Sequence, residues 1–455
     1  MPVHPIDYRY GSDELRKIFD VNNKVKLMAK VEAALAKAQA ELGIIPAEAA
    51  DAIEKAAEQI SYEEVKELER LIGHETMALV RVLAEKSGKY GKYVHLGATS
   101  NDILDTTMAI QIKEAGCVLL RRSLELLQAV IDRGRELVNL PQLGRTHGMA
   151  ADPITLGFKM AYWSYMIRNS IERLAEAIKA ASKGKMSGAV GTMAAMSLLY
   201  DNPAEVQSRV MEILGIEPAD VSTQIVPRDG LAQLVTSVAI FSSVLDLIGN
   251  EIRNLQRTEI AEVQEPFRSE SQVGSSTMPH KRNPIMSEKV CGLARVIRGL
   301  ALTSLENVVL EHERDLTNSS TERCMVPEVL LLFDEQLVTL TKVIRGLVIN
   351  EDRIKENLAK FGEMATAERV MMELFKRGVG RQEAHELVRK AAMRAYESKK
   401  PFIDSLLEDE NISKYFDKRE LEELTDPTTY LGISAEIAKK EFDRAEEFIR
   451  GVSCG

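Results

Sequence analysis

The sequence predicts an all-α protein of three helical domains, in which a central bundle of long helices assembles into a multi-subunit helical core. The 455 residues are 45% hydrophobic but only 5% aromatic, and residues that favour helices dominate. Apolar residues recur at steps of three and four over long stretches without proline. No stretch alternates with a period of two for long enough to predict a major sheet.

The chain divides into three zones along its length. Residues 1–110 hold shorter predicted helices, broken at Gly43–Pro46 and Gly88–Gly97. Residues 111–349 hold the long ones, and residues 350–455 return to short, highly charged helices with breaks at Gly378–Gly380 and Asp426–Pro427. We therefore predict an N-terminal helical domain, a central long-helix bundle and a C-terminal helical domain.

The long helices are predicted from apolar spacing. Between Pro227 and Pro266 this spacing predicts one helix of up to about 55 Å. Similar patterns predict helices over about 102–138, 154–182, 285–312 and 326–348. Helices of this length are typical of bundles. Because their apolar residues cover more than one face, we expect a homo-oligomer that buries the remaining faces.

Charge and composition exclude several classes of protein. The formal net charge is −10, from 59 Lys and Arg against 69 Asp and Glu, which argues against nucleic acid as a partner. We see neither an N-terminal signal peptide nor an apolar run of about 20 residues, so we expect no membrane partner and a cytoplasmic protein. The four cysteines form no CxxC, so we expect no metal, and each is expected to be an isolated small hydrophobe.

Histidines are scarce, and their settings indicate chemistry. Any one of the seven, taken alone, is more often a structural histidine than a catalytic one. Five of them, however, lie in segments rich in Gly, Ser or Thr near predicted helix entrances, where catalytic groups are often positioned. These five are His74, His95, His147, His280 and His312.

The most unusual segment is 269–288, which reads SESQVGSSTMPHKRNPIMSE. It brings adjacent serines, Lys281 and Arg282 to a helix start near Ile285. Hydroxyls, backbone N–H groups and cations at one place suit an anionic substrate and stabilise negative charge in a transition state. An ordinary polar surface loop has a similar composition, and the segment lacks the GxxxxGK[ST] pattern of a P-loop.

Six motifs together resemble the fumarase/aspartase superfamily, whose members eliminate fumarate from succinyl-bearing substrates. They occur in the order of that superfamily, and the resemblance extends over most of residues 1–330. The motifs are VHLGATSNDILDT (94–106), GRTHGMAADPITLGFK (144–159), SGAVGT (187–192), STQIVPRD (222–229), GSSTMPHKRNP (274–284) and ERDLTNSSTER (313–323).

Within the superfamily the chain most resembles the adenylosuccinate lyase family. The discriminating residues are Arg9-Tyr10, His74 after Gly73, Thr146-His147, and three residues of ERDLTNSSTER. The resemblance implies elimination of fumarate from adenylosuccinate and from the related succinyl-carboxamide imidazole nucleotide. It also implies a homotetramer in which three subunits build each site, with small-molecule nucleotide substrates and no cofactor.

The reaction requires a base, a cradle for negative charge and an acid for the leaving nitrogen. His147 is predicted as the general acid, since histidine titrates near neutral pH and the motif agrees. The resemblance assigns the base to Ser275; physical reasoning does not separate it from Ser276, and an alkoxide there would need stabilisation by Lys281. Ser276, Lys281 and Asn283 would bind the carboxylate. Glu288 would orient His147, although an ordinary solvated helix position is nearly as common.

The nucleotide half of the substrate requires a phosphate site, for which arginine's planar fork is suited. By resemblance the nucleotide and phosphate contacts are Arg9, Tyr10, Arg314, Ser319 and Arg323. The remaining predicted substrate contacts are His74, His95, Thr99, Ser100, Thr146, Gln224 and Met278.

Two features keep alternatives open. Met149, Ala150 and Asn101 depart from residues common in the family, which affects fine substrate contacts. GSSTMPHKRNP is shared almost verbatim with carboxymuconate-type cycloisomerases, so that activity is one alternative. A catalytically silent relative with a structural or binding role is another, although the joint presence of His147, Ser275, Lys281 and Asn283 argues against silence.

Overall fold

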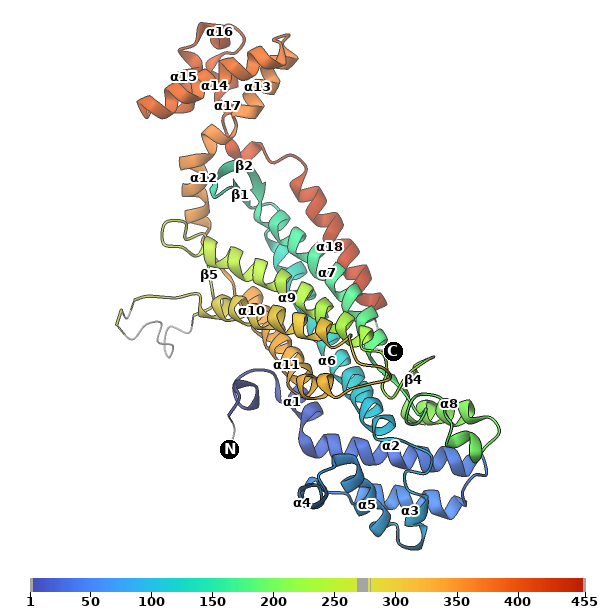
Figure 1. Cartoon of the computed structure of the whole chain (residues 1–455). Helices are drawn as coiled ribbons and strands as arrows, with labels where there is room; N and C mark the ends of the chain where they lie inside the picture. The colour runs from blue at the N-terminus through green and yellow to red at the C-terminus, as the bar shows by residue number, and fades with distance from the viewer. Residues whose placement is uncertain (1–2, 268–276, 279, 453–455) are drawn as a thin grey trace.

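A computed structural model describes residues 3–267, 277–278 and 280–452, and it confirms the all-α prediction. Long helices run through the middle of an elongated molecule, with smaller helices gathered at both ends (Figure 1). The N-terminal helices are α1 (Asp13–Phe19), α2 (Val21–Glu41), α3 (Ala47–Glu58), α4 (Tyr62–Ile72) and α5 (Glu75–Lys86). The central helices are α6 (Ser100–Glu136), α7 (Leu156–Ala181), α9 (Asp229–Leu255), α10 (Ile285–Glu306) and α11 (Thr317–Arg345), with the shorter α8 (Pro203–Leu214) between α7 and α9.

The C-terminal region contains seven helices among the described residues, and six short strands form three two-stranded sheets. The helices are α12 (Glu351–Ala365), α13 (Ala367–Lys376), α14 (Arg381–Ser398), α15 (Phe402–Leu407), α16 (Glu410–Ser413), α17 (Lys418–Leu424) and α18 (Ser434–Gly451). The sheets pair β1 (Pro141–Thr146) with β2 (Met149–Thr155), β3 (Lys183–Gly184) with β4 (Glu217–Pro218), and β5 (Val263–Gln264) with β6 (Val348–Ile349).

The long helices lie close to the predicted ranges, with three corrections. Helix α10 ends at Glu306, six residues before the predicted end. Helix α9 ends at Leu255, so its length is about 40 Å instead of 55 Å. The chain turns there, and Ala261 adopts a left-handed φ of 53° before strand β5. Helix α11 begins nine residues before the predicted start because it continues through Pro327. Proline removes one helical hydrogen bond, but here the helix tolerates it.

Three hydrophobic cores hold the chain together. The central core joins α6, α7, α9, α10 and α11, and the C-terminal core lies among α13–α17. The N-terminal core includes α8 through Val206 and Val210, and the central core includes α18 through Phe442. These two segments therefore pack outside the zones in which sequence order places them. The domain limits at residues 110 and 349 stay a prediction.

Helix α9 has the length and hydropathy of a membrane-spanning helix, alone among the described helices. Most of its apolar residues are nevertheless part of the central core, where it packs between α7 and α10 (Figure 1). Its hydropathy is explained by burial inside a bundle.

The three described cysteines differ in burial and bonding. Burial, followed by a hydrogen bond with the Asp246 side chain, raises the pKa of Cys291 to about 11, so this thiol stays protonated and packs as a small hydrophobe. Cys324 is an exposed free thiol. Cys117 is disulfide-bonded, so the expectation of isolated cysteines is wrong for this residue.

Candidate active site

The predicted site residues that the structure describes form three groups, which lie in different places in the single chain (Figure 1). The first group is at the tip of the β1–β2 hairpin, the second at the start of α10, and the third around a cavity bounded by α2, α6 and α11. Ser275 and Ser276 lie outside the described residues.

His147 occupies the two-residue turn between β1 and β2. His147 has φ of 54° and Gly148 has φ of 76°, and positive φ at both central residues is the pattern of a type I′ hairpin turn. The glycines and the proline around His147 predicted a loop before the next helix, and the structure instead has a β-hairpin here. Three of the six described non-glycine residues with positive φ are histidines, and such conformations concentrate at functional sites.

The hairpin is anchored at its base and open at its tip. Buried Glu262 accepts hydrogen bonds from Arg145, from Gln142 at 2.7 Å and from Asn357 of α12 at 2.9 Å. Thr146, His147 and Met149 are exposed, and no hydrogen bond or ion pair of the His147 side chain is found within the described chain. The geometry therefore presents an imidazole on a rigid support.

The second group lies at the entrance to α10. Glu265 accepts hydrogen bonds from the backbone N–H groups of Met286 (3.1 Å) and Ser287 (2.6 Å), which caps the first turn of α10. Lys281 is exposed, Asn283 is partly buried, and the backbone N–H of Lys281 bonds to the carbonyl of Met278.

Glu288 does not orient His147 within one chain. Glu288 is exposed one turn into α10, and no hydrogen bond or ion pair joins it to His147 among the described residues. The prediction that Glu288 orients His147 therefore requires residues of two subunits.

The third group surrounds a cavity of about 280 Å³. Arg314, Ser319 and Arg323 line it, so the structure brings these three predicted phosphate contacts together. First-turn residues of three long helices also line it: Val21 of α2, Asn101 of α6, and Ser319 of α11. Helix N-termini carry partial positive charge and free N–H groups, so three of them at one cavity favour an anion.

The positive charge of Arg228, which also lines this cavity, is balanced by two carboxylates. Arg228 is buried and binds Asp105 at 2.8 and 2.9 Å and Glu322 at 2.7 and 3.2 Å. Burial lowers the pKa of Arg228, but the two carboxylates raise it by more, so the net shift is upward. The ion pairs join α6, α11 and the segment before α9, and they give the cavity a rigid floor.

Arg314, in contrast, has no carboxylate bound to it within the described chain. It donates to the amide oxygen of Gln224 at 2.9 Å, and its buried Nε has no partner. Burial, and then the charge of Arg228, lower the pKa of Arg314 despite the opposing charge of Asp105. The Arg314 guanidinium thus retains unsatisfied positive charge and donor capacity toward the cavity.

Other predicted contacts lie at or beyond the edge of the cavity. His74 is the N-cap of α5, where its Nδ1 accepts from the backbone N–H of Met77 at 3.2 Å. Arg9 is exposed beside the Tyr10 ring, and neither residue lines the cavity. Gln224 is connected to the cavity through its hydrogen bond with Arg314. Arg9 and Tyr10 lie outside the cavity.

His95, Thr99 and Ser100 precede or open α6. His95 has φ of 63°, and its Nδ1 lies 2.7 Å from Oε1 of Glu32, a fully buried side chain of α2. Burial lowers the pKa of His95, but the hydrogen bond and charge of Glu32, with the charge of Asp102, raise it by more. The net pKa lies above its ordinary value, so His95 is biased toward the cationic form.

Asp102 fixes the start of α6. Its carboxylate accepts hydrogen bonds from the backbone N–H groups of Thr99 (2.8 Å) and Ser187 (2.9 Å) and pairs with Lys185 at 2.5 Å. Asp102 and Lys185 are both fully buried, and a buried pair is strongly destabilised when one partner is removed. Lys185 thereby holds the SGAVGT segment against the Thr99–Ser100 turn.

The Glu32–His95 pair predicts a pH-dependent stability. The pKa of His95 is higher in the folded protein than in the unfolded chain, where it is near 6.5. The pair therefore contributes its full stabilisation below about pH 6.5, and that stabilisation is lost as the pH rises through the pKa of His95 in the folded protein. The difference in melting temperature between wild type and Glu32→Gln should therefore shrink as the pH rises above about 6.5. The matched control is Glu41→Gln on the same helix, since Glu41 pairs with an arginine. Parallel pH profiles for the two variants would contradict the prediction.

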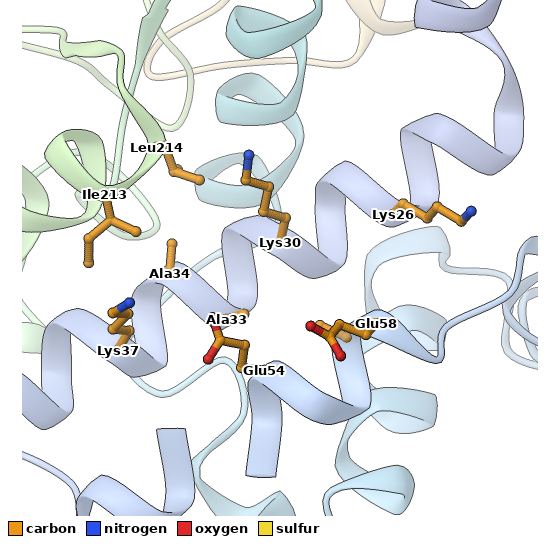
Figure 2. A pocket seen from close by; sticks show the side chains of 10 residues that line it. Lys26, Lys30, Ala33, Ala34, Lys37, Glu54, Glu58, Ile213 and Leu214 are labelled. Carbon is orange, nitrogen blue, oxygen red and sulfur yellow. The ribbon is translucent and has the colours of Figure 1, made fainter. Parts of the chain in front are cut away.

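A second cavity, of about 540 Å³, lies between α2, α3 and α8 (Figure 2). Lys26, Lys30 and Lys37 line one wall, and Glu54 and Glu58 line the other. None of the predicted site residues lines this cavity. Its three exposed lysines face two exposed carboxylates, so its charge is more nearly balanced than that of the first cavity.

Four supporting residues were not predicted from the sequence: Glu32, Asp102, Lys185 and Arg228. Arg228 and Asp102 lie inside quoted motifs, so their positions were a usable signal. Glu32 and Lys185 lie in ordinary helical or glycine-containing sequence, and only the fold places them beside the site.

Within the described ranges, no three His, Cys, Asp or Glu side chains are grouped to hold a metal ion.

Comparison with known proteins identifies the family. Residues 7–299 match the lyase family model, and residues 364–440 match the model of the adenylosuccinate lyase C-terminus. The chain is 48% identical over 440 residues to adenylosuccinate lyase of Methanocaldococcus jannaschii, covering 96% of this chain and 95% of that one. It is also 48% identical to the Pyrococcus horikoshii enzyme of the same name, covering 99% of both chains.

Solved structures agree in fold. A fumarate lyase from Mesorhizobium sp. BNC1 is 30% identical with a TM-score of 0.88, covering 97% of this chain and all of that one. The 3-carboxy-cis,cis-muconate lactonizing enzyme from Pseudomonas putida is 28% identical with a TM-score of 0.87, covering 98% and 99%. Since the adenylosuccinate lyases are much more similar in sequence and match over nearly the full length, the chain belongs to the adenylosuccinate lyase family.

Proposed function

We propose that this protein is a cytoplasmic lyase that eliminates fumarate from adenylosuccinate to give AMP, and from the succinyl-carboxamide imidazole nucleotide to give the free carboxamide. The observation that carries the proposal is the sequence identity of 48%, over nearly the full length, to two adenylosuccinate lyases. The cavity with Arg314, Ser319 and Arg323 supports it, because a nucleotide substrate needs an anion site separate from the reacting atoms.

The proposed chemistry is a β-elimination. Ser275, as its alkoxide, removes a proton from the carbon next to a succinyl carboxylate. The electrons accumulate on that carboxylate, where Ser276, Lys281 and Asn283 stabilise the charge. The C–N bond then breaks as protonated His147 gives its proton to the leaving nitrogen. One proton is taken from carbon and one is given to nitrogen, and the products are fumarate and the nucleotide.

The site is proposed to be shared among subunits of a homotetramer. The hairpin, the α10 entrance and the cavity occupy different places in one chain (Figure 1), yet the reaction needs all three. The central bundle also exposes large apolar side chains, which a neighbouring subunit would cover. These include Tyr162 of α7, Ile240 and Leu247 of α9, and Val296, Leu302 and Leu305 of α10.

The proposal predicts a loss of absorbance when the purified protein is mixed with adenylosuccinate, because cleavage changes the purine chromophore. The parallel substrate is 3-carboxy-cis,cis-muconate, which tests the activity named for the Pseudomonas putida structure. Turnover of the muconate without turnover of adenylosuccinate would favour the cycloisomerase. No turnover of either substrate across pH and concentration would favour a silent relative.

A further inference from the structure

The cavity between α2, α6 and α11 contains a charged side chain that the proposed function leaves without a role. Lys24, one turn into α2, lines the cavity together with Arg314, Ser319 and Arg323. Its ammonium group contacts Oε1 of Glu75 at 2.6 Å. Arg323 contacts the other oxygen, Oε2, of the same carboxylate at 3.4 Å. Glu75 is the first residue of α5 and directly follows His74.

The balance of charge around Glu75 indicates what the cavity binds. Asp105 and Glu322 are both ion-paired with Arg228, and within the described chain neither forms an ion pair with another cation. Arg314 has only a neutral amide partner in the described chain, and Lys24 and Arg323 share one carboxylate. Three cations thus face one carboxylate at a place where three helix N-termini meet. This arrangement suits an added dianion such as a phosphate monoester.

Two buried polar atoms support a ligand at this place. The Thr107 hydroxyl and the Asn318 amide oxygen belong to residues that line the cavity and are 1% exposed, and neither atom has a hydrogen-bond partner among the described residues. Buried polar groups are nearly always satisfied, so these two atoms are available to hydrogen-bond a ligand that enters the cavity.

We propose that Lys24 is an additional phosphate-binding residue, and that Glu75 competes with the phosphate for Lys24 and Arg323. This proposal rests on the proposed function for the identity of the phosphate as that of a nucleotide. In the absence of ligand, Glu75 neutralises the two cations and keeps them in place. When the phosphate enters, Lys24 and Arg323 exchange the carboxylate for phosphate oxygens, and Glu75 turns to solvent.

The test compares two substrates that differ only in the phosphate. Adenylosuccinate and its dephosphorylated nucleoside are assayed with the full-length wild type, Lys24→Met, Lys24→Arg and Glu75→Gln. Lys24→Met should lower kcat/KM for the nucleotide by about tenfold or more, since a charge-assisted hydrogen bond is lost, and leave the nucleoside value unchanged. Lys24→Arg should restore most of the loss. Glu75→Gln should lower KM for the nucleotide by about threefold to tenfold, because a competitor is removed.

The control is Lys26→Met, two residues further along α2, where the lysine lines the other cavity (Figure 2). It removes the same charge from the same helix and should leave the ratio of the two substrates unchanged. Since the Lys24 side chain is 30% exposed and Glu75 keeps Arg323, Lys24→Met should fold normally.

The same variants are titrated with AMP, adenosine and inorganic phosphate by calorimetry, which needs no turnover. If the wild type cleaves adenylosuccinate but Lys24→Met keeps the wild-type ratio of nucleotide to nucleoside, the Lys24 proposal is wrong and the lyase proposal stands. If the wild type cleaves neither substrate, the lyase proposal fails. Weaker binding of AMP and phosphate to Lys24→Met would then still support the anion site, and unchanged binding would overturn it.

Discussion

Replacing His147 by glutamine is expected to lower kcat by about 10²- to 10⁴-fold, the usual contribution of a general acid. The exposed imidazole at the hairpin tip has no partner within the described chain, so it has no visible structural role there. Folding and assembly should therefore be retained. Steady-state kinetics with adenylosuccinate measure the loss, and light scattering checks that the oligomer is intact.

The turn geometry defines the right control for this variant. His147 has φ of 54°, a conformation that asparagine tolerates better than most residues. His147→Asn removes the acid with little backbone strain, so it should lose as much activity as His147→Gln. A folded variant of either kind that keeps more than about a tenth of the wild-type kcat would exclude His147 as the general acid.

Much of the fold could be predicted because long helices have a strong apolar period. The predicted ranges for α6 and α7 agree with the structure within two residues, since both helices are bounded by clear caps or turns. The starts and ends that differ have local causes. Pro327 suggested a helix boundary, but α11 passes through it, and the apolar spacing before Pro266 gave no warning that the chain turns after Leu255.

The sequence motifs indicated which residues form the site, but the charges and ion pairs of the site could not be predicted from them. Arg314, Ser319 and Arg323 belong to one motif, and the structure confirms that they share one cavity. The charge of that cavity, however, depends on partners that are distant in sequence. Lys24 and Glu75 are 51 residues apart, and Arg323 is 248 residues from Glu75. No local pattern reports such pairs, because they are set by how α2, α5 and α11 pack.

Two inactive variants are expected to restore activity when they share a tetramer. We predict that His147→Gln and Lys281→Ala, mixed in equal amounts, denatured and reassembled, regain about a quarter of the wild-type activity. The reason is geometric. If a site takes His147 from one subunit and Lys281 from another, each position is intact half of the time, and both are intact in about one site in four.

The sharpest control for this experiment uses two changes in the same segment. Lys281 and Asn283 are two residues apart before α10, so one chain must supply both to any site. Mixtures of Lys281→Ala with Asn283→Ala should therefore stay inactive, although hybrids form equally well. Rescue of the first pair without rescue of the second requires that the hairpin and the α10 entrance of different subunits meet at one site. If verified hybrids of the first pair remain inactive, His147 and Lys281 do not act in a site shared between chains, and the proposed assembly is wrong.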